Sequence, residues 1–274
     1  MPPDRTNVEE KESLTDEQKQ DRFVELRNLI QGEELLKNID TGDNFLERYF
    51  YGTNFSVEDS FKKLKAFREL QIEKPEWFTK EAPLDKKPII EMNARILLDE
   101  CDKEGRPIYL AKMGNIDVNK MSMYDVLALD DLWLEFVLTK NPRVTKNGFC
   151  MIMDMENCSW KLVKWMSPEN VKIGVKKLEA LPFNVLKVHV VNNSFVVNTI
   201  VRMMWPFLPE KIKNMVVFHF NDWEVLYQHI DQEKLPIEYG GIKKIDYSEL
   251  YEKLFQMNDE IFRSFASYRT IENT

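Results

Sequence analysis

The residues of this chain best suited to chemistry are three histidines and three cysteines. His189, His219 and His229 show no metal-ligand spacing to one another, and the cysteines form no CxxC pair. His189 lies in an apolar, strand-like run, where a hydrogen-bonded structural role is favoured over catalysis. Cys150 alternates with Ile152 in another such run, so it is interpreted as a lining residue and not as a nucleophile. These residues predict neither a metal site nor a nucleophilic centre.

The motifs of common enzyme classes are also missing from the sequence. There is no GxSxG elbow, no GxxxxGK[ST] phosphate-binding loop, and no GxGxxG after a predicted strand. We therefore expect a protein that is not an enzyme and that holds no metal and no cofactor apart from a bound ligand.

One carboxylate stands out on a predicted helix that begins at Tyr124. Asp130 is flanked at helical spacing by apolar residues, whereas Asp131 groups with Ala128 and Glu135 and is predicted to face solvent. Burying a carboxylate is costly unless a cation, a hydrogen-bond donor or water pairs with it. Asp130 is therefore a candidate polar group of an apolar pocket. The alternative is a helix rotated so that Asp130 reaches water.

A second unusual stretch is NNSFVVNTIVRMMWPFLPEK, at residues 192–211. If it is helical, its polar residues Asn198, Thr199 and Arg202 form only a narrow stripe, and the remaining circumference is apolar. The stretch is too short, and too interrupted by prolines, to span a bilayer. It is therefore predicted to cover either an apolar core or an apolar ligand.

The composition is that of a globular protein. The 274 residues are 43% hydrophobic and 31% charged, and the net charge of −8 argues against nucleic acid as a partner. No run of about 18 apolar residues occurs, so no transmembrane helix is expected. The first twenty residues contain no apolar stretch typical of a secretory signal, so we expect a cytoplasmic protein.

The first part of the chain, residues 15–80, has the pattern of an all-helical module. Apolar residues recur at three- and four-residue spacing after Thr15. Asp43 is a candidate N-cap for a second helix, and Ser56 with Asp59 is a candidate cap for a third.

Beyond Pro83, apolar runs of strand length alternate with helical patterns. The runs are ILLDE, RPIYLAKM, FCMIMDM, VLKVHVVN and NMVVFHF. This alternation predicts an α/β fold with a largely parallel sheet. We assign residues 84–245 to this α/β domain and residues 246–274 to a C-terminal helical tail.

Several fragments, in this order and spacing, resemble the CRAL-TRIO family, the lipid-binding fold of retinaldehyde-binding, tocopherol-transfer and yeast-type phosphatidylinositol transfer proteins. The resemblance extends over about residues 25–245. It rests on DNFLERYFYGTNFSVEDSFKKLKAF, GRP, GFCMIMDMEN with Asp154, LPFNVLKVHVVNN, WPFLPEKIK, FHFND and LPIEYGG.

The resemblance implies a cavity that is floored by the sheet and closed by a mobile gate helix at about 193–213. Taken alone, the apolar line of that helix would be interpreted as packing on a filled core. The cavity residues that the resemblance and the helical spacing together predict are Leu127, Asp130, Trp133, Leu134, Cys150, Ile152, Leu181, Phe183, Val188, Val197, Ile200, Met204 and Leu208.

The chain departs from the family in a basic cluster that retinaldehyde and tocopherol carriers use to bind phosphoinositide headgroups. The corresponding positions hold Tyr51, Thr53, Asn184, Leu186, Lys211 and Met215. Only Lys211 is basic, so it is the single predicted membrane or phosphate contact, and a phosphoinositide-coupled mechanism is not expected. Lys172, Lys176 and Lys177 form either a substitute patch or a solvated helix face.

The sequence thus predicts a monomeric cytoplasmic carrier of a small hydrophobic lipid, of isoprenoid type such as a retinoid or tocopherol. It would exchange this ligand during transient contact with a membrane surface. The alternatives are a phospholipid or phosphoinositide transfer protein, and a lipid-sensing scaffold that transfers nothing.

Overall fold

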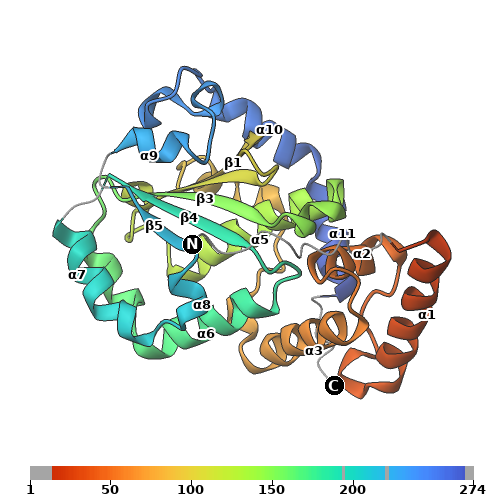
Figure 1. Cartoon of the computed structure of the whole chain (residues 1–274). Helices are drawn as coiled ribbons and strands as arrows, with labels where there is room; N and C mark the ends of the chain where they lie inside the picture. Colours follow the sequence, from red (N-terminus) through yellow and green to blue (C-terminus); the bar gives the residue numbers. More distant parts are fainter. Residues whose placement is uncertain (1–13, 193–194, 220–221, 269–274) are drawn as a thin grey trace, which may run out of the picture.

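The structure is a computed structural model, and it describes residues 14–192, 195–219 and 222–268 (Figure 1). Side chains are described for all of these residues except 195–197, 200 and 204.

Three helices make up the N-terminal part of the chain, as predicted: α1 (Asp16–Gly32), α2 (Asp43–Gly52) and α3 (Val57–Glu73). Ser56 caps α3, because its side chain accepts a hydrogen bond from the backbone N–H of Asp59. The predicted cap of α2 is shifted by one residue, since Gly42 is the N-cap and Asp43 the first helical residue. The carboxylate of Asp43 still lies in the first turn, where it is favourable to the helix dipole.

A five-stranded sheet forms the centre of the molecule. Its strands lie side by side in chain order, namely β1 (Arg95–Cys101), β2 (Pro107–Lys112), β3 (Phe149–Asp154), β4 (Leu186–Val191) and β5 (Val216–Phe218). β1 and β2 pair antiparallel, and every other neighbouring pair is parallel. The predicted α/β fold with a largely parallel sheet is confirmed.

Helices cover both faces of this sheet (Figure 1). On one face lie α5 (Met123–Lys140), α6 (Pro168–Ala180), α7 (Phe195–Met204) and α8 (Glu210–Lys213). On the other lie α9 (Trp223–Tyr227) and α10 (Tyr247–Gln256). The remaining helices are the short α4 (Lys87–Ile90) and α11 (Asn258–Tyr268), which packs against α5.

A buried ionic network joins α2 and α11 to α5. Arg48 Nη2 lies 2.8 Å from Glu135 Oε1, and the hydroxyl of Tyr268 donates to the other oxygen of Glu135. Glu135 is almost fully buried, so its predicted position on a solvent-facing side of the helix was wrong. The sequence pattern failed here because a paired carboxylate and an exposed one look the same in a helical repeat.

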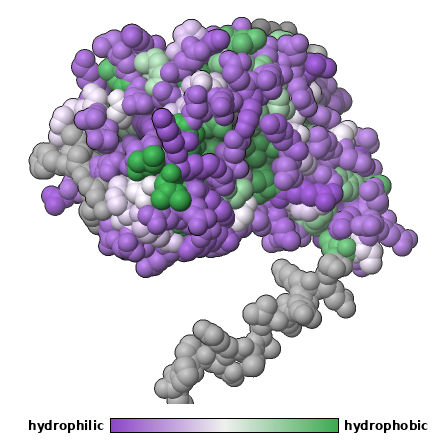
Figure 2. All heavy atoms as spheres, turned by 90° about the horizontal axis from the view of Figure 1, so that it is seen from above, coloured by the Kyte–Doolittle hydropathy of each residue, from purple (hydrophilic) through white to green (hydrophobic). Residues whose placement is uncertain are grey.

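The helices described here are too short or too polar to cross a bilayer. The face seen in Figure 2 is mainly hydrophilic and carries separate hydrophobic patches. The predicted C-terminal tail contains α10 and α11, and its last residues, 269–274, lie outside the described part of the chain.

Candidate functional site

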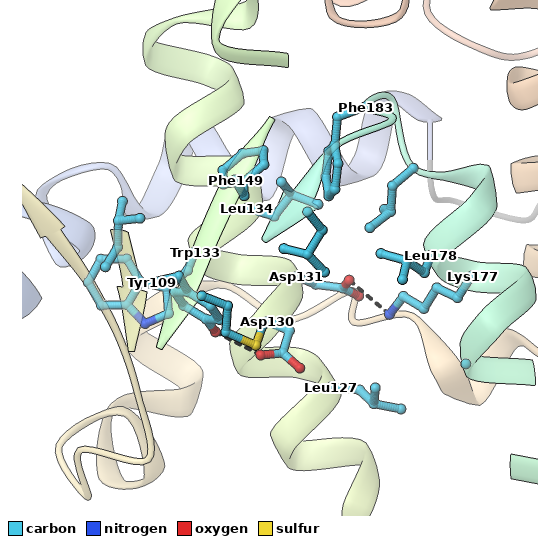
Figure 3. Close-up of a pocket in the computed structure, with 15 residues that line it drawn as sticks. Tyr109, Leu127, Asp130, Asp131, Trp133, Leu134, Phe149, Lys177, Leu178 and Phe183 are labelled. Atoms are coloured by element: carbon cyan, nitrogen blue, oxygen red, sulfur yellow. Dashed lines mark hydrogen bonds and ion pairs between the residues drawn. The ribbon is translucent and has the colours of Figure 1, made fainter. Parts of the chain in front are cut away.

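A mostly apolar cavity of about 190 Å³ lies between the sheet and helices α5 and α6 (Figure 3). Its described lining residues are Leu97, Tyr109, Leu127, Asp130, Asp131, Trp133, Leu134, Phe149, Met151, Gly174, Lys177, Leu178, Leu181, Phe183 and Leu186. Six predicted cavity residues are among them, namely Leu127, Asp130, Trp133, Leu134, Leu181 and Phe183. Whether these residues bind a ligand remains a prediction.

Strand register decides which side chains floor the cavity. Leu97, Tyr109 and Met151 are aligned across β1, β2 and β3, and alternate residues of a strand point to opposite faces. Phe149 and Met151 of β3 therefore face the cavity. The predicted residues Cys150 and Ile152 face the other side of the sheet, where both are fully buried, so this part of the prediction chose the wrong face. Alternation alone gives two faces of an apolar strand and does not say which one borders a cavity.

Val188 of β4 is aligned with Met151 and shares the cavity face of the sheet. It is buried but is not one of the described residues that border the cavity. The loop before β4 contributes more of the wall. Phe183 of this loop packs on Phe149, with ring centroids 4.7 Å apart.

Asp130 is held at the cavity wall by two donors. Its Oδ1 lies 2.8 Å from Nε of Arg95 and 2.7 Å from the hydroxyl of Tyr109. Burial, and next the carboxylate of Asp130, raise the pKa of Tyr109 well above its usual value, so the phenol keeps its proton and donates a hydrogen bond to Asp130. Trp133 stabilises the same part of the cavity wall, because its indole N–H donates to the carbonyl of Arg95. The expected cationic and hydrogen-bonding partners of Asp130 are thus present.

Asp131 is buried, although the sequence pattern placed it in solvent. Its Oδ1 lies 2.9 Å from Nζ of Lys177 on α6, and its Oδ2 accepts a hydrogen bond from the backbone N–H of Thr79. Lys177 also donates to the carbonyl of Trp77 at 2.6 Å and lies over the ring of Phe78. The ion pair therefore crosses the cavity wall (Figure 3). With the contacts to Thr79 and Trp77, it ties three separate segments together.

This ion pair shows what sequence reasoning missed. The sequence pattern predicts that Lys172, Lys176 and Lys177 form a substitute patch or a solvated helix face, but Lys177 is buried, and only Lys172 and Lys176 of the three are exposed. A usable signal was present, since Lys177 follows Ile173 by four residues on the apolar stripe of its helix.

The predicted gate corresponds to α7, the 3-10 turn Trp205–Phe207 and α8. The side chains of Val197, Ile200 and Met204 lie outside the described ones. Leu208 is half-buried and does not border the cavity as described. Met203 and Phe207 are 52% and 48% exposed, so this segment presents apolar side chains to solvent.

Lys211 lies in a separate groove between α3 and α6, together with Lys62, Lys63 and Lys176. Four carboxylates line the same groove, namely Asp59, Glu69, Glu73 and Glu179. Nζ of Lys63 donates to the carbonyls of Glu179, Leu181 and Phe183. Burial, and next the charge of Lys211, lower the pKa of Lys63 to about 8.

Two other residues at positions of the family's basic cluster make hydrogen bonds that hold the fold together. Asn184 donates to the carbonyl of Gly52, and the hydroxyl of Thr53 donates to the carbonyl of Tyr49.

The three histidines, far apart in sequence, meet on the sheet face opposite the cavity. Nδ1 of His189 lies 2.8 Å from Nε2 of His219, and the ring centroid of His229 is 4.8 Å from that of His189. Burial is the largest cause that lowers the pKa of all three, that of His189 to about 3, so the rings are neutral at neutral pH. The described residues contain no group arranged to hold a metal ion. His189 is hydrogen-bonded within the interior, as its strand pattern predicted.

The chain is similar in sequence to proteins of one known family. A family model described as "CRAL/TRIO domain" matches residues 92–241. Clavesin-1 of Rattus norvegicus is 30% identical over 205 residues, which are 73% of this chain and 57% of that protein. Clavesin-2 of Homo sapiens is 26% identical, over 74% of this chain and 62% of its own length. The chain thus spans about three fifths of these relatives.

A solved structure with the same fold is the crystal structure of Sfh5. It superposes with a TM-score of 0.53 at 14% sequence identity, covering 91% of this chain and 99% of that one. This likeness concerns the fold alone.

Proposed function

Since this chain belongs to the CRAL/TRIO family, we propose that it binds a small hydrophobic lipid in the cavity between the sheet, α5 and α6 and carries it between membranes. The observation that supports this most directly is the cavity itself, whose wall is apolar except for Tyr109, Asp130, Asp131 and Lys177. Burial of apolar surface stabilises a bound lipid by about 25 cal/mol per Å², before the cost of association.

The pairing of the polar groups in the cavity wall favours lipid carriage over catalysis. The amine of Lys177 and the carboxylate of Asp131 neutralise each other, and the phenol of Tyr109 donates to Asp130. A nucleophile needs an adjacent base or a free, activated group. Tyr109 has a carboxylate beside it, but its pKa is raised well above the usual value, so its oxygen stays protonated, and the amine of Lys177 is paired with Asp131. We therefore propose a binding protein that needs no cofactor.

The cavity volume bears on the type of lipid. At about 190 Å³ it is smaller than the 300–1,000 Å³ common for drug-sized ligands. A compact isoprenoid-type lipid, such as a retinoid or tocopherol, requires less enlargement of this space than a two-chain phospholipid does. The flexible side chain of Met151 in the floor can adapt to such a ligand.

Exchange with a membrane is the proposed task of α7 and the turn that follows it. The exposed apolar side chains of Met203 and Phe207 suit insertion at a bilayer interface. We propose a cytoplasmic monomer whose gate opens when this segment lies on the membrane surface.

The test combines lipid extraction with a variant that fills the cavity. Mass spectrometry of extracts from the purified protein is expected to show one bound lipid per chain. Leu178→Trp should abolish that binding, because Leu178 lines the cavity, whereas Ile242→Trp at an exposed site should not. A stable wild-type protein that holds no lipid and moves none between vesicles would contradict carriage and favour a scaffold.

A further inference from the structure

The charged groups around the cavity already compensate one another. Lys177 is the only cation among the described lining residues, and Asp131 neutralises it. Both oxygens of Asp131 are already engaged by the protein, because Lys177 pairs with Oδ1 and the N–H of Thr79 donates to Oδ2. Arg95, behind the wall, pairs with Asp130. An anionic group that entered the cavity would find no uncompensated cation among these residues, so its desolvation would not be repaid.

Asp130 differs from Asp131 because only one of its oxygens is engaged. Both Arg95 and Tyr109 donate to Oδ1, and no donor in the described part of the chain reaches Oδ2. The side chain is 35% exposed and borders the cavity. Its two donors belong to buried residues, so the plane of the carboxylate is fixed. Oδ2 is therefore a positioned acceptor at the cavity wall (Figure 3).

From this arrangement we propose that Asp130 selects an uncharged lipid with a hydroxyl group, and that the cavity rejects the corresponding acid. The inference rests on the proposed lipid carriage and specifies its ligand class. An ionised carboxylate only accepts hydrogen bonds, so Oδ2 requires a donor from the ligand. An alcohol supplies that donor, an ether does not, and a carboxylate or phosphate adds a like charge.

Three retinoids with the same carbon chain provide the test: retinol, retinyl methyl ether and retinoic acid. Binding is followed by quenching of tryptophan fluorescence, to which Trp133 in the cavity wall contributes. A hydrogen bond to a charged group favours retinol over the ether by about tenfold or more, and the acid should bind more weakly still. Equal affinity for retinol and the ether, or tightest binding of the acid, would overturn the selectivity and leave carriage intact.

The matched variants are Asp130→Asn and Leu127→Met, which lie one turn apart on the same wall. Asp130→Asn should bring the affinity for retinol close to that for the ether and weaken the ether little. Leu127→Met should keep the full preference for retinol. If Asp130→Asn does not fold because Arg95 is left unpaired, Asp130→Asn combined with Arg95→Met removes both charges and gives the same comparison.

Extraction of the natural ligand separates the two levels of the proposal. A recovered lipid with a hydroxyl group supports the selectivity. A recovered lipid with no hydroxyl or N–H group would overturn the selectivity while carriage stands. If no lipid is recovered and no retinoid binds, both carriage and selectivity fail.

Discussion

The two faces of the sheet are built from alternate residues of the same strands, yet they are covered in different ways. On the face under α9 and α10, Ile108, Ile152 and His189 are 0% exposed, so the packing leaves no space beside them. On the face toward α5 and α6, Met151 and Leu186 are only half-buried and border the cavity. One face is therefore filled, and the other leaves room for a ligand.

The two faces also differ in how their polar groups are paired. The cavity face carries full charges in pairs that bridge separate segments, such as Asp131 with Lys177. The opposite face carries neutral histidines, whose tilted rings pack on one another, and a buried ion pair, Asp102 with Arg106, that joins residues only four apart in the chain. The pair of Asp131 with Lys177 holds α5 and α6 at a fixed distance without filling the space between them. Apolar side chains at the same positions would tend to close that space. This difference can be tested by changing one face at a time.

The largest effect is expected from Lys177→Met, which leaves the buried carboxylate of Asp131 without its cation. Removing one partner of a buried ion pair costs about 3–5 kcal/mol. Urea denaturation gives the change in the free energy of unfolding. The matched control is Lys176→Met, because Lys176 is exposed and lies 3.5 Å from an exposed Glu73. A surface pair of this kind contributes about 0–1 kcal/mol, so equal losses in the two variants would mean that the Lys177 pair is open to water.

The next comparison uses neighbouring residues of β3 that point to opposite faces. Ile152→Ala should lower the free energy of unfolding by about 2–5 kcal/mol, since it leaves a hole in a filled region. Met151→Ala should cost less, because it only enlarges a cavity that already exists, and it should change lipid affinity. Denaturation of both variants and titration with one lipid separate the two outcomes. A larger loss in Met151→Ala would reverse the assignment of the faces.

Most of the fold could be predicted from the sequence because its signals are local. The apolar runs gave all five strands, and Ser56 with Asp59 marked the start of α3. The alternation of strands and helices was enough to predict a largely parallel sheet.

The site was predicted only in part, because its key contacts join distant segments. Leu127 and Leu134 were found from helical spacing, but the pairing of Asp131 with Lys177 depends on how α5 and α6 pack together. The choice between Cys150 and Met151 failed for a similar reason, since both faces of β3 are apolar in the sequence. The meeting of the three histidines likewise follows from topology and not from spacing.

Acidification should destabilise the protein through the face opposite the cavity. Burial, and next His219, lower the pKa of His189 to about 3, while an unfolded histidine titrates near 6.5. Below pH 6.5 the unfolded chain binds a proton that the native chain does not, so stability is complete above this pH and falls as the pH decreases. Between pH 7 and pH 5 this histidine alone should cost about 2 kcal/mol.

Urea denaturation at several pH values measures this slope, and His189→Gln provides the control. The variant lacks the titrating ring, so its stability should depend less steeply on pH between 7 and 5, whatever its absolute stability. An unchanged slope in His189→Gln would assign the acid sensitivity to other groups.

The smallest effect is expected from two tyrosines that each donate to an aspartate, one on each side of the sheet. Tyr239 donates to Oδ2 of Asp154 at 2.9 Å, and both residues are buried. Tyr239→Phe leaves that oxygen without this donor and should cost about 1–2 kcal/mol. Tyr109→Phe should cost less, because Asp130 keeps Arg95 and water can reach it through the cavity. Thermal melts of the two variants resolve a difference of about 1 kcal/mol, which shifts the Tm by a few degrees. Equal shifts would show that the cavity gives Asp130 no access to water, and the contrast between the two faces would then lie in packing alone.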